Sequence, residues 1–181
     1  QLFVWLPQLG LLAAGDNFYK AFPNLYTIRG TPHRSLKQWA ASIDRMRSLP
    51  IQHLVPSHTA PLSNKEEIYQ ALTDYRDGIR YVHDQSVRWI NAGFTPPELA
   101  HKVKLPPHLA SSPYLQEFYG AVDFSTRGMF SGNIGWFSGN PSELRPEPLK
   151  QQAQRVMALA GGEQKLREAI NNAAEAGEHQ W

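Results

Sequence analysis

The amino-acid sequence predicts an α+β fold, with a strand-rich part at residues 1–62 and helices over residues 63–181. Two short apolar runs, at residues 2–6 and 11–14, meet at a turn and are typical of adjacent strands. After residue 62 the apolar residues recur every three or four positions, which is the spacing of amphipathic helices. We therefore expect a domain boundary near Ser63.

The strand-rich part is expected to contain one helix between short extended segments. Residues 25–28 and 53–56 are further candidate strands. Ser35 is a residue type that caps helices, and it precedes an amphipathic stretch over residues 36–49 that Pro50 ends. Strand, helix and strand in this order predict the end of an α/β sandwich.

The helical part is expected to begin with one long helix. Ser63 and Glu66 match a capping box before a helix over residues 65–90. Five of its apolar residues have the a/d spacing of a helix–helix seam, here called the apolar seam: Ile68, Leu72, Tyr75, Ile79 and Val82. We expect the apolar seam to form a dimer interface. Shorter helices are predicted over residues 95–103, 113–130, 149–160 and 163–176, with a loop at residues 105–109.

Composition and charge exclude several classes of function. Hydrophobic residues make up 41% of the chain and charged residues 19%, which is typical of a globular protein. The net charge of +2 gives no electrostatic basis for binding nucleic acid or an anionic membrane. No apolar run reaches the roughly 18 residues of a membrane span. The absence of cysteine excludes disulfides, cysteine zinc ligands and thiol nucleophiles.

Asp16 and His58 are the candidate metal ligands. Each follows an expected strand, and α/β folds bind ligands where strands end. Carboxylate oxygen and imidazole nitrogen both bind zinc, but a catalytic zinc needs about three protein ligands and a water. The chain therefore supplies part of a metal site at most. The alternatives are that Asp16 is a turn residue and His58 a partly exposed loop histidine.

Arg29 and Arg34 flank a short loop and are candidate anion ligands, together with Asn24. A guanidinium group binds tetrahedral oxyanions such as sulfate or phosphate through paired N–H donors. The amide of Asn24 can donate to the same anion. The alternative is that the two arginines are solvated or pair with Asp44 or Glu66.

Several runs of residues, in one order over nearly the whole chain, together resemble a known family. The runs are DNFY at 16–19, FPNLYTIRGT at 22–31, LVPSH at 54–58, YRDGIRYVHDQ at 75–85, LPPHLA at 105–110, YLQEFYG at 114–120 and GWF at 135–137. They resemble the zinc-dependent alkyl sulfatases of the metallo-β-lactamase superfamily. The resemblance implies that residues 1–62 are the C-terminal remnant of a metallo-β-lactamase αββα sandwich. It also implies that residues 63–181 are most of a helical alkyl sulfatase dimerisation domain.

The resemblance also assigns roles to the candidate ligands. It implies two zinc ions per complete subunit, with a bridging carboxylate at Asp16 and the last zinc histidine at His58. Asn24 and Arg29 match positions that bind the sulfate group, and Arg34 is expected to join them. Many members that act on linear alkyl chains carry glutamate where this chain has Asp16.

The expected activity is hydrolysis of alkyl sulfate esters, such as dodecyl sulfate, by a homodimeric zinc hydrolase. The His-x-His-x-Asp-His zinc motif of the family does not occur in this sequence. We therefore expect the chain to be a portion of a longer protein and to be inactive alone. The main alternative is a helical dimerisation module without a functional metal site, and a weaker one is an α-solenoid scaffold.

Overall fold

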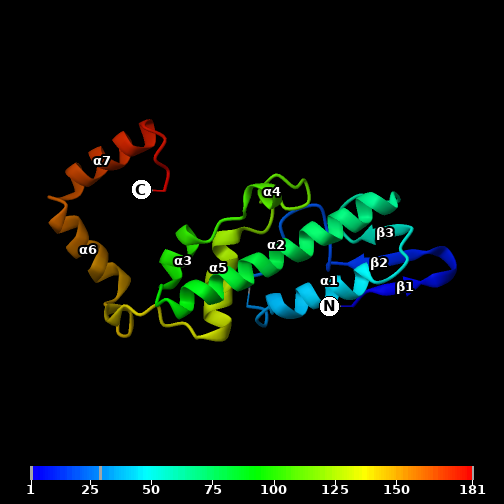
Figure 1. Cartoon of the computed structure of the whole chain (residues 1–181). Helices are drawn as coiled ribbons and strands as arrows, with labels where there is room; N and C mark the ends of the chain where they lie inside the picture. The colour runs from blue at the N-terminus through cyan, green and yellow to red at the C-terminus, as the bar shows by residue number, and fades with distance from the viewer. Residues whose placement is uncertain (1, 29, 181) are drawn as a thin grey trace. The chain divides into compact units, whose positions relative to one another are not determined.

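The computed structural model describes residues 2–28 and 30–180, which form a small sheet and a larger set of helices (Figure 1). The chain divides into two compact units, Gln1–Gly139, here the larger unit, and Asn140–Trp181, the C-terminal unit. Residues on both sides of Ser63 lie in the larger unit, so the expected 1–62 and 63–181 domains stay a prediction. Among the described residues, no helix has both the length and the apolar character needed to span a bilayer.

The sheet of the described residues has the strand order β1-β2-β3. Strand β1 (Val4–Leu6) pairs antiparallel with β2 (Leu11–Gly15) after the 3-10 turn η1 (Pro7–Leu9). Gly10 makes the turn possible, because its φ of 57° is in the left-handed region. Strand β2 pairs in parallel with β3 (His53–Pro56), so the carboxyl ends of the two strands lie at one edge. The predicted strands on either side of Gly10 and at 53–56 are confirmed.

The expected strand at residues 25–28 does not form. Leu25 and Tyr26 are buried, but they pack against helix α5 (Val122–Asn133) instead of a strand. Gly128 of α5 allows this approach, because a Cβ there would lie only 2.8 Å from the Cβ of Tyr26. The apolar side chains of Leu25 and Tyr26 are therefore buried against a helix and not within a sheet.

The predicted helices over residues 36–49 and 65–90 are confirmed. Helix α1 (Leu36–Arg47) begins after Ser35, whose Oγ accepts a hydrogen bond of 3.3 Å from a first-turn N–H. Helix α2 (Lys65–Asn91) is capped by Asn64, whose Oδ1 accepts a first-turn N–H at 2.9 Å. The expected cap at Ser63 is therefore wrong by one residue, because the Ser63 hydroxyl lies 2.9 Å from a histidine ring nitrogen instead.

The segment after α2 differs from the prediction. Helix α3 (Pro96–Lys102) forms as expected, and residues 107–110 form the one-turn helix α4 (Pro107–Ala110) where a loop was expected. Helix α5 begins at Val122, so the prediction of a helix from residue 113 is wrong. The hydroxyls of Ser112 and Tyr114 instead donate hydrogen bonds of 2.7 and 2.6 Å to carboxylates on α2. These long-range bonds hold the segment in an irregular course over α2.

The apolar seam of α2 lies in the core of the larger unit. All five of its residues are buried, with exposed fractions of 2% or less. Helices α1 and α5 pack against α2, and Figure 1 shows α1 running beside α2 and α5 crossing it. The prediction that this seam is a dimer interface is wrong, because a/d spacing also suits packing between helices of one chain.

The C-terminal unit is built around two helices, α6 (Leu149–Leu159) and α7 (Glu163–Glu175), after the 3-10 turn η2 (Pro141–Glu143). Both predicted helices are confirmed, and two glycines with positive φ join them. None of the described residues of this unit is buried. Its large apolar side chains with at least half their surface exposed are Leu144, Leu149, Val156, Leu159 and Ile170.

Candidate functional site

Asp16 and His58 lie against each other where β2 and β3 end. Asp16 Oδ1 and His58 Nε2 are 3.1 Å apart. The two side chains remain 54% and 69% exposed, respectively, so solvent and ions can reach both. The sequence reasoning placed them at two strand ends, and the parallel pairing of β2 with β3 is what brings those ends to one edge.

The neighbours of Asp16 fix the end of β2. The strand register shifts at Gly15, whose φ of 58° is in the left-handed region, and Gly15 O accepts a hydrogen bond from Ser57 N. Asn17 is 2% exposed, and its side-chain amide donates to two backbone carbonyls at 2.9 and 3.1 Å. The indole N–H of Trp39 donates to Asn17 O at 2.9 Å. Asp16 is therefore presented by a rigid turn tied to helix α1.

A pocket of about 520 Å³, here the strand-end pocket, opens beside the Asp16–His58 pair. Its lining residues come from the strand ends, from the segment before α1, from α1 itself and from the segment before α5: Asp16, Tyr19, Ala21, Arg34, Trp39, His58, Thr59 and Tyr119. Three residues singled out from the sequence, Asp16, Arg34 and His58, thus share one pocket. A carboxylate, an imidazole and a guanidinium at one cavity can hold a metal cation and an anion side by side.

Tyr19 lines the strand-end pocket as an uncharged aromatic residue. Burial raises the pKa of Tyr19 to about 12, and the nearby Arg34 charge only partly opposes this effect. Its Oη accepts the backbone N–H of Asn24 at 2.7 Å. Tyr19 therefore keeps its proton at neutral pH, and its hydroxyl is held against the Asn24 backbone.

The candidate sulfate ligands have different positions. Arg34 lines the strand-end pocket, and its Nη1 donates a hydrogen bond of 2.7 Å to Asn24 O. Asn24 is 9% exposed, and its Oδ1 has no hydrogen-bond partner in the part of the chain that the structure describes. Arg29 lies outside the described residues. Asp44 pairs with arginines of α1 and α2 and not with Arg34, so the pairing of Arg34 with Asp44 that was one alternative is wrong.

The sequence reasoning missed the aromatic lining of the strand-end pocket. Nothing in the sequence next to Tyr19, Trp39 or Tyr119 marks them as pocket residues, and such aromatics are usually core residues. Tyr19 is the last residue of the DNFY run that begins with Asp16, but Trp39 and Tyr119 come from other parts of the chain. Only the three-dimensional structure brings them to the pocket.

The donor atoms of the strand-end pair fit part of a zinc site. Carboxylate oxygen and imidazole nitrogen are zinc ligands, and these two are close together and open to solvent. Within residues 2–28 and 30–180, however, no group of three or more His, Cys, Asp or Glu side chains could hold a metal ion. The pair therefore offers two donor groups of the kind that bind zinc, and a tightly bound zinc would need others in addition.

Comparisons with known proteins find similarity to alkylsulfatases over the whole chain. Residues 95–181 match the protein family described as alkyl sulfatase dimerisation. The chain is 46% identical over its full length to the linear primary-alkylsulfatase of a Pseudomonas strain, and 26% identical to an alkyl/aryl-sulfatase of Saccharomyces cerevisiae. It covers 35% and 28% of these two proteins, respectively, so it spans about a third of the length of the curated relatives it matches.

A solved structure has the same fold as this chain. The structure of the stereoselective inverting sec-alkylsulfatase of Pseudomonas sp. superimposes with a TM-score of 0.93 and 30% sequence identity. The match covers 99% of this chain and 29% of that one. Sequence and fold therefore agree over the same continuous segment.

Proposed function

Because the chain is related over its whole length to the alkylsulfatases, we propose that it is part of a zinc-dependent alkyl sulfatase, which hydrolyses alkyl sulfate esters to alcohol and sulfate. The observation that supports this function best is the strand-end pocket, in which Asp16 and His58 lie beside Arg34. We further propose that residues 1–62 are the C-terminal part of a metallo-β-lactamase sandwich. Residues 63–181 then form the helical dimerisation domain, of which 95–181 match the family.

Each polar residue of the site has a proposed role. Asp16 and His58 hold zinc, which when bound activates water and polarises the ester. Arg34 binds the sulfate group and stabilises the negative charge that grows on it as the ester bond breaks. Asn24 and Arg29 assist Arg34, and the Asn24 backbone already joins Arg34 to Tyr19 through the hydrogen bonds of its N–H and C=O groups.

Zinc binding by the isolated chain tests the metal ligands. We expect well under two zinc ions per chain, held weakly, because the described residues supply only a pair of ligands. Asp16→Ala or His58→Ala should lower the zinc affinity at least about tenfold, measured by competition with a coloured zinc indicator. His53→Ala is the matched control, since His53 is also exposed and begins β3. Equal zinc affinities in all four proteins would contradict the assignment.

Hydrolysis of dodecyl sulfate tests the activity itself. We expect none from the chain alone. A chimaera, in which this chain replaces the aligned segment of the Pseudomonas linear primary-alkylsulfatase, should retain hydrolysis. His58→Ala in the chimaera should lower the rate by at least about a hundredfold, because a metal contributes several kcal/mol to the transition state. His53→Ala should leave it unchanged. Equal rates for both variants would support the alternative of a dimerisation module without a functional metal site.

We propose that the chain forms a homodimer through the C-terminal unit. Leu149, Val156 and Leu159 of α6 are 82%, 54% and 88% exposed and recur at helical spacing, and Ile170 of α7 is 50% exposed. These four residues are the exposed apolar stripe. Apolar faces of this kind are usually covered by a partner. A second copy is the occupant that the match to a dimerisation family supports.

Charged residues on the stripe are expected to separate the dimer. Val156→Glu with Leu159→Glu should yield a folded monomer of 20.5 kDa in analytical ultracentrifugation, against a dimer for the parent. The fold should persist because both side chains are solvent-exposed. Gln151→Glu with Gln154→Glu adds the same charge elsewhere on α6 and should remain dimeric. A dimer from both double variants would exclude the stripe as the interface.

A further inference from the structure

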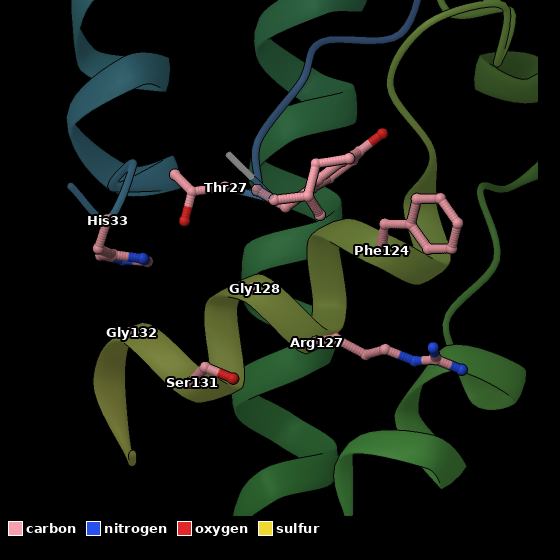
Figure 2. A pocket seen from close by; sticks show the side chains of 9 residues that line it. Thr27, His33, Phe124, Arg127, Gly128, Ser131 and Gly132 are labelled. Atoms are coloured by element: carbon pink, nitrogen blue, oxygen red, sulfur yellow. The ribbon is translucent and has the colours of Figure 1, made fainter. Parts of the chain in front are cut away.

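A second pocket, of about 560 Å³, lies between the segment before α1 and helix α5 (Figure 2). We call it the α5 pocket. It shares no lining residue with the strand-end pocket. The side chains that give it its chemistry are Tyr26, Ile28, His33, Phe124, Arg127 and Ser131.

One side of the α5 pocket is apolar. The rings of Tyr26 and Phe124 meet edge to face with their centroids 5.3 Å apart, and Ile28 lies beside them in the lining. Phe124 is 45% exposed and Ile28 is 78% exposed. The wall therefore presents apolar surface that the larger unit leaves in contact with water, and an apolar ligand would remove it from water.

Two glycines on one face of α5 shape the pocket. Gly128 and Gly132 are one helical turn apart, and neither carries a side chain that could fill the space. A Cβ at Gly132 would lie 2.0 Å from His33 Nδ1, so the imidazole rests directly on the helix backbone. The pocket thus depends on bare backbone at two positions, where Tyr26 and His33 lie close to α5.

Arg127 places a guanidinium at the apolar wall. Arg127 is exposed, and the structure records no ion pair or hydrogen bond for its side chain within the described residues. Figure 2 shows its guanidinium extending from α5 on the same side as the Phe124 ring. The carboxylate of Asp123, on the same helix, accepts the N–H of Phe124 instead. The pocket therefore combines an apolar surface with the positive charge of a guanidinium group that has no recorded ion pair among the described residues.

We propose that the α5 pocket binds a single-chain anionic amphiphile. The alkyl chain lies against Tyr26, Ile28 and Phe124, and the negative head group pairs with Arg127. The volume is in the range of small-molecule sites, which are mostly apolar with a few polar groups that fix orientation. The choice of a sulfur oxyanion as head group rests on the proposed function, whereas the apolar chain and negative charge follow from the lining alone.

Calorimetric titration of the full chain with 1-decanesulfonate, below its micelle concentration, tests the proposal. The sulfonate has no ester bond, so binding is measured without hydrolysis. We expect saturable binding of one molecule, about tenfold weaker binding of 1-decanol because the charge-assisted hydrogen bond is lost, and none of methanesulfonate. Equal affinity for decanesulfonate and decanol would overturn the assigned head-group site.

Two variants test the head-group contact and the apolar wall of the pocket separately. Arg127→Gln should lower the affinity for decanesulfonate about tenfold and leave that for decanol unchanged. Phe124→Ala should weaken both ligands about three- to tenfold, because apolar contact area is lost. Arg45→Gln and Leu9→Ala are the controls, since they remove an exposed arginine and an exposed leucine outside the pocket. Equal effects of Arg127→Gln and Arg45→Gln would contradict the proposal.

A decanesulfonate with a photoreactive diazirine at the chain end locates the binding site. Labelling should fall on residues 26–28 and 124–132, as read by mass spectrometry of the digested chain. Labelling concentrated on residues 149–170 would instead identify the exposed apolar stripe as the binding surface and overturn the proposal. Labelling should persist in an Asp16→Ala, His58→Ala chain, so failure of the zinc assignment and failure of this site are distinguishable.

Discussion

Lysine at both Leu72 and Ile79 is expected to unfold the larger unit and not to separate two folded copies. The two side chains are 1% and 0% exposed and belong to the core cluster that joins α1, α2 and the strands. Each lysine ammonium would lose its hydration, and the apolar packing contacts of the replaced side chain would be lost as well. The loss of unfolding free energy should exceed about 5 kcal/mol, which is comparable to the whole stability of many domains.

Circular dichroism during urea titration, together with sedimentation, measures this effect. The control is a chain with lysine at Gln70 and Asp84, which are exposed positions of the same helix. That chain should keep its urea midpoint within about 1 kcal/mol of the parent. A folded monomer from the Leu72 and Ile79 double variant would mean that the seam is a surface between copies after all.

The seam and the stripe explain why the sequence could predict helices but not their partners. Leu72 and Ile79 on α2 recur at the same helical spacing as Leu149 and Val156 on α6. The first pair is buried by α1 and other parts of the same unit, whereas the second is exposed. Spacing reports which face of a helix is apolar, and only tertiary structure decides what covers that face.

In two segments, contacts with residues distant in sequence prevent the secondary structure that the local sequence favours. Residues 113–121 have a sequence that suits a helix, yet the Tyr114 hydroxyl bonds Glu67 on α2 and keeps the segment irregular. Residues 25–28 have strand-like composition, yet they pack on α5. Each partner is distant in sequence, so no local pattern could indicate it.

The candidate site was predictable where its residues follow strands. Asp16 and His58 were found because two strand ends in an α/β fold tend to share an edge, and the parallel pairing of β2 and β3 produces the contact. Trp39 and Tyr119 were not found, since they come from α1 and from the segment before α5. The positions of Asp16 and His58 follow from the pairing of two strands, whereas the walls of the pocket are formed by packing between elements that are distant in sequence.

Alanine at Gly120 is expected to weaken the larger unit at the junction that supports the strand-end pocket. A Cβ at this position would lie 2.1 Å from Pro23 O and 2.5 Å from Phe22 O, and backbone atoms cannot move aside as side chains can. Gly120 N also donates to Phe22 O at 3.0 Å, and Phe22 N donates to Gln116 O at 2.8 Å. Opening this junction to admit a methyl group should cost about 2 to 4 kcal/mol of unfolding free energy.

Gly78→Ala is the matched control for this prediction. Its Cβ would also be crowded, at 2.9 Å, but by the flexible end of the Leu115 side chain. Alanine is favoured over glycine in the interior of a helix by about 0.5 to 1 kcal/mol, so this variant should stay within about 1 kcal/mol of the parent in urea unfolding. Equal urea midpoints for the two variants would show that the junction is not rigid.

A loss of stability in Gly120→Ala alone would mean that residues 116–120, which match the dimerisation family, hold the segment carrying Asn24 in place. The sulfate-binding side of the pocket would then depend on the helical part of the chain.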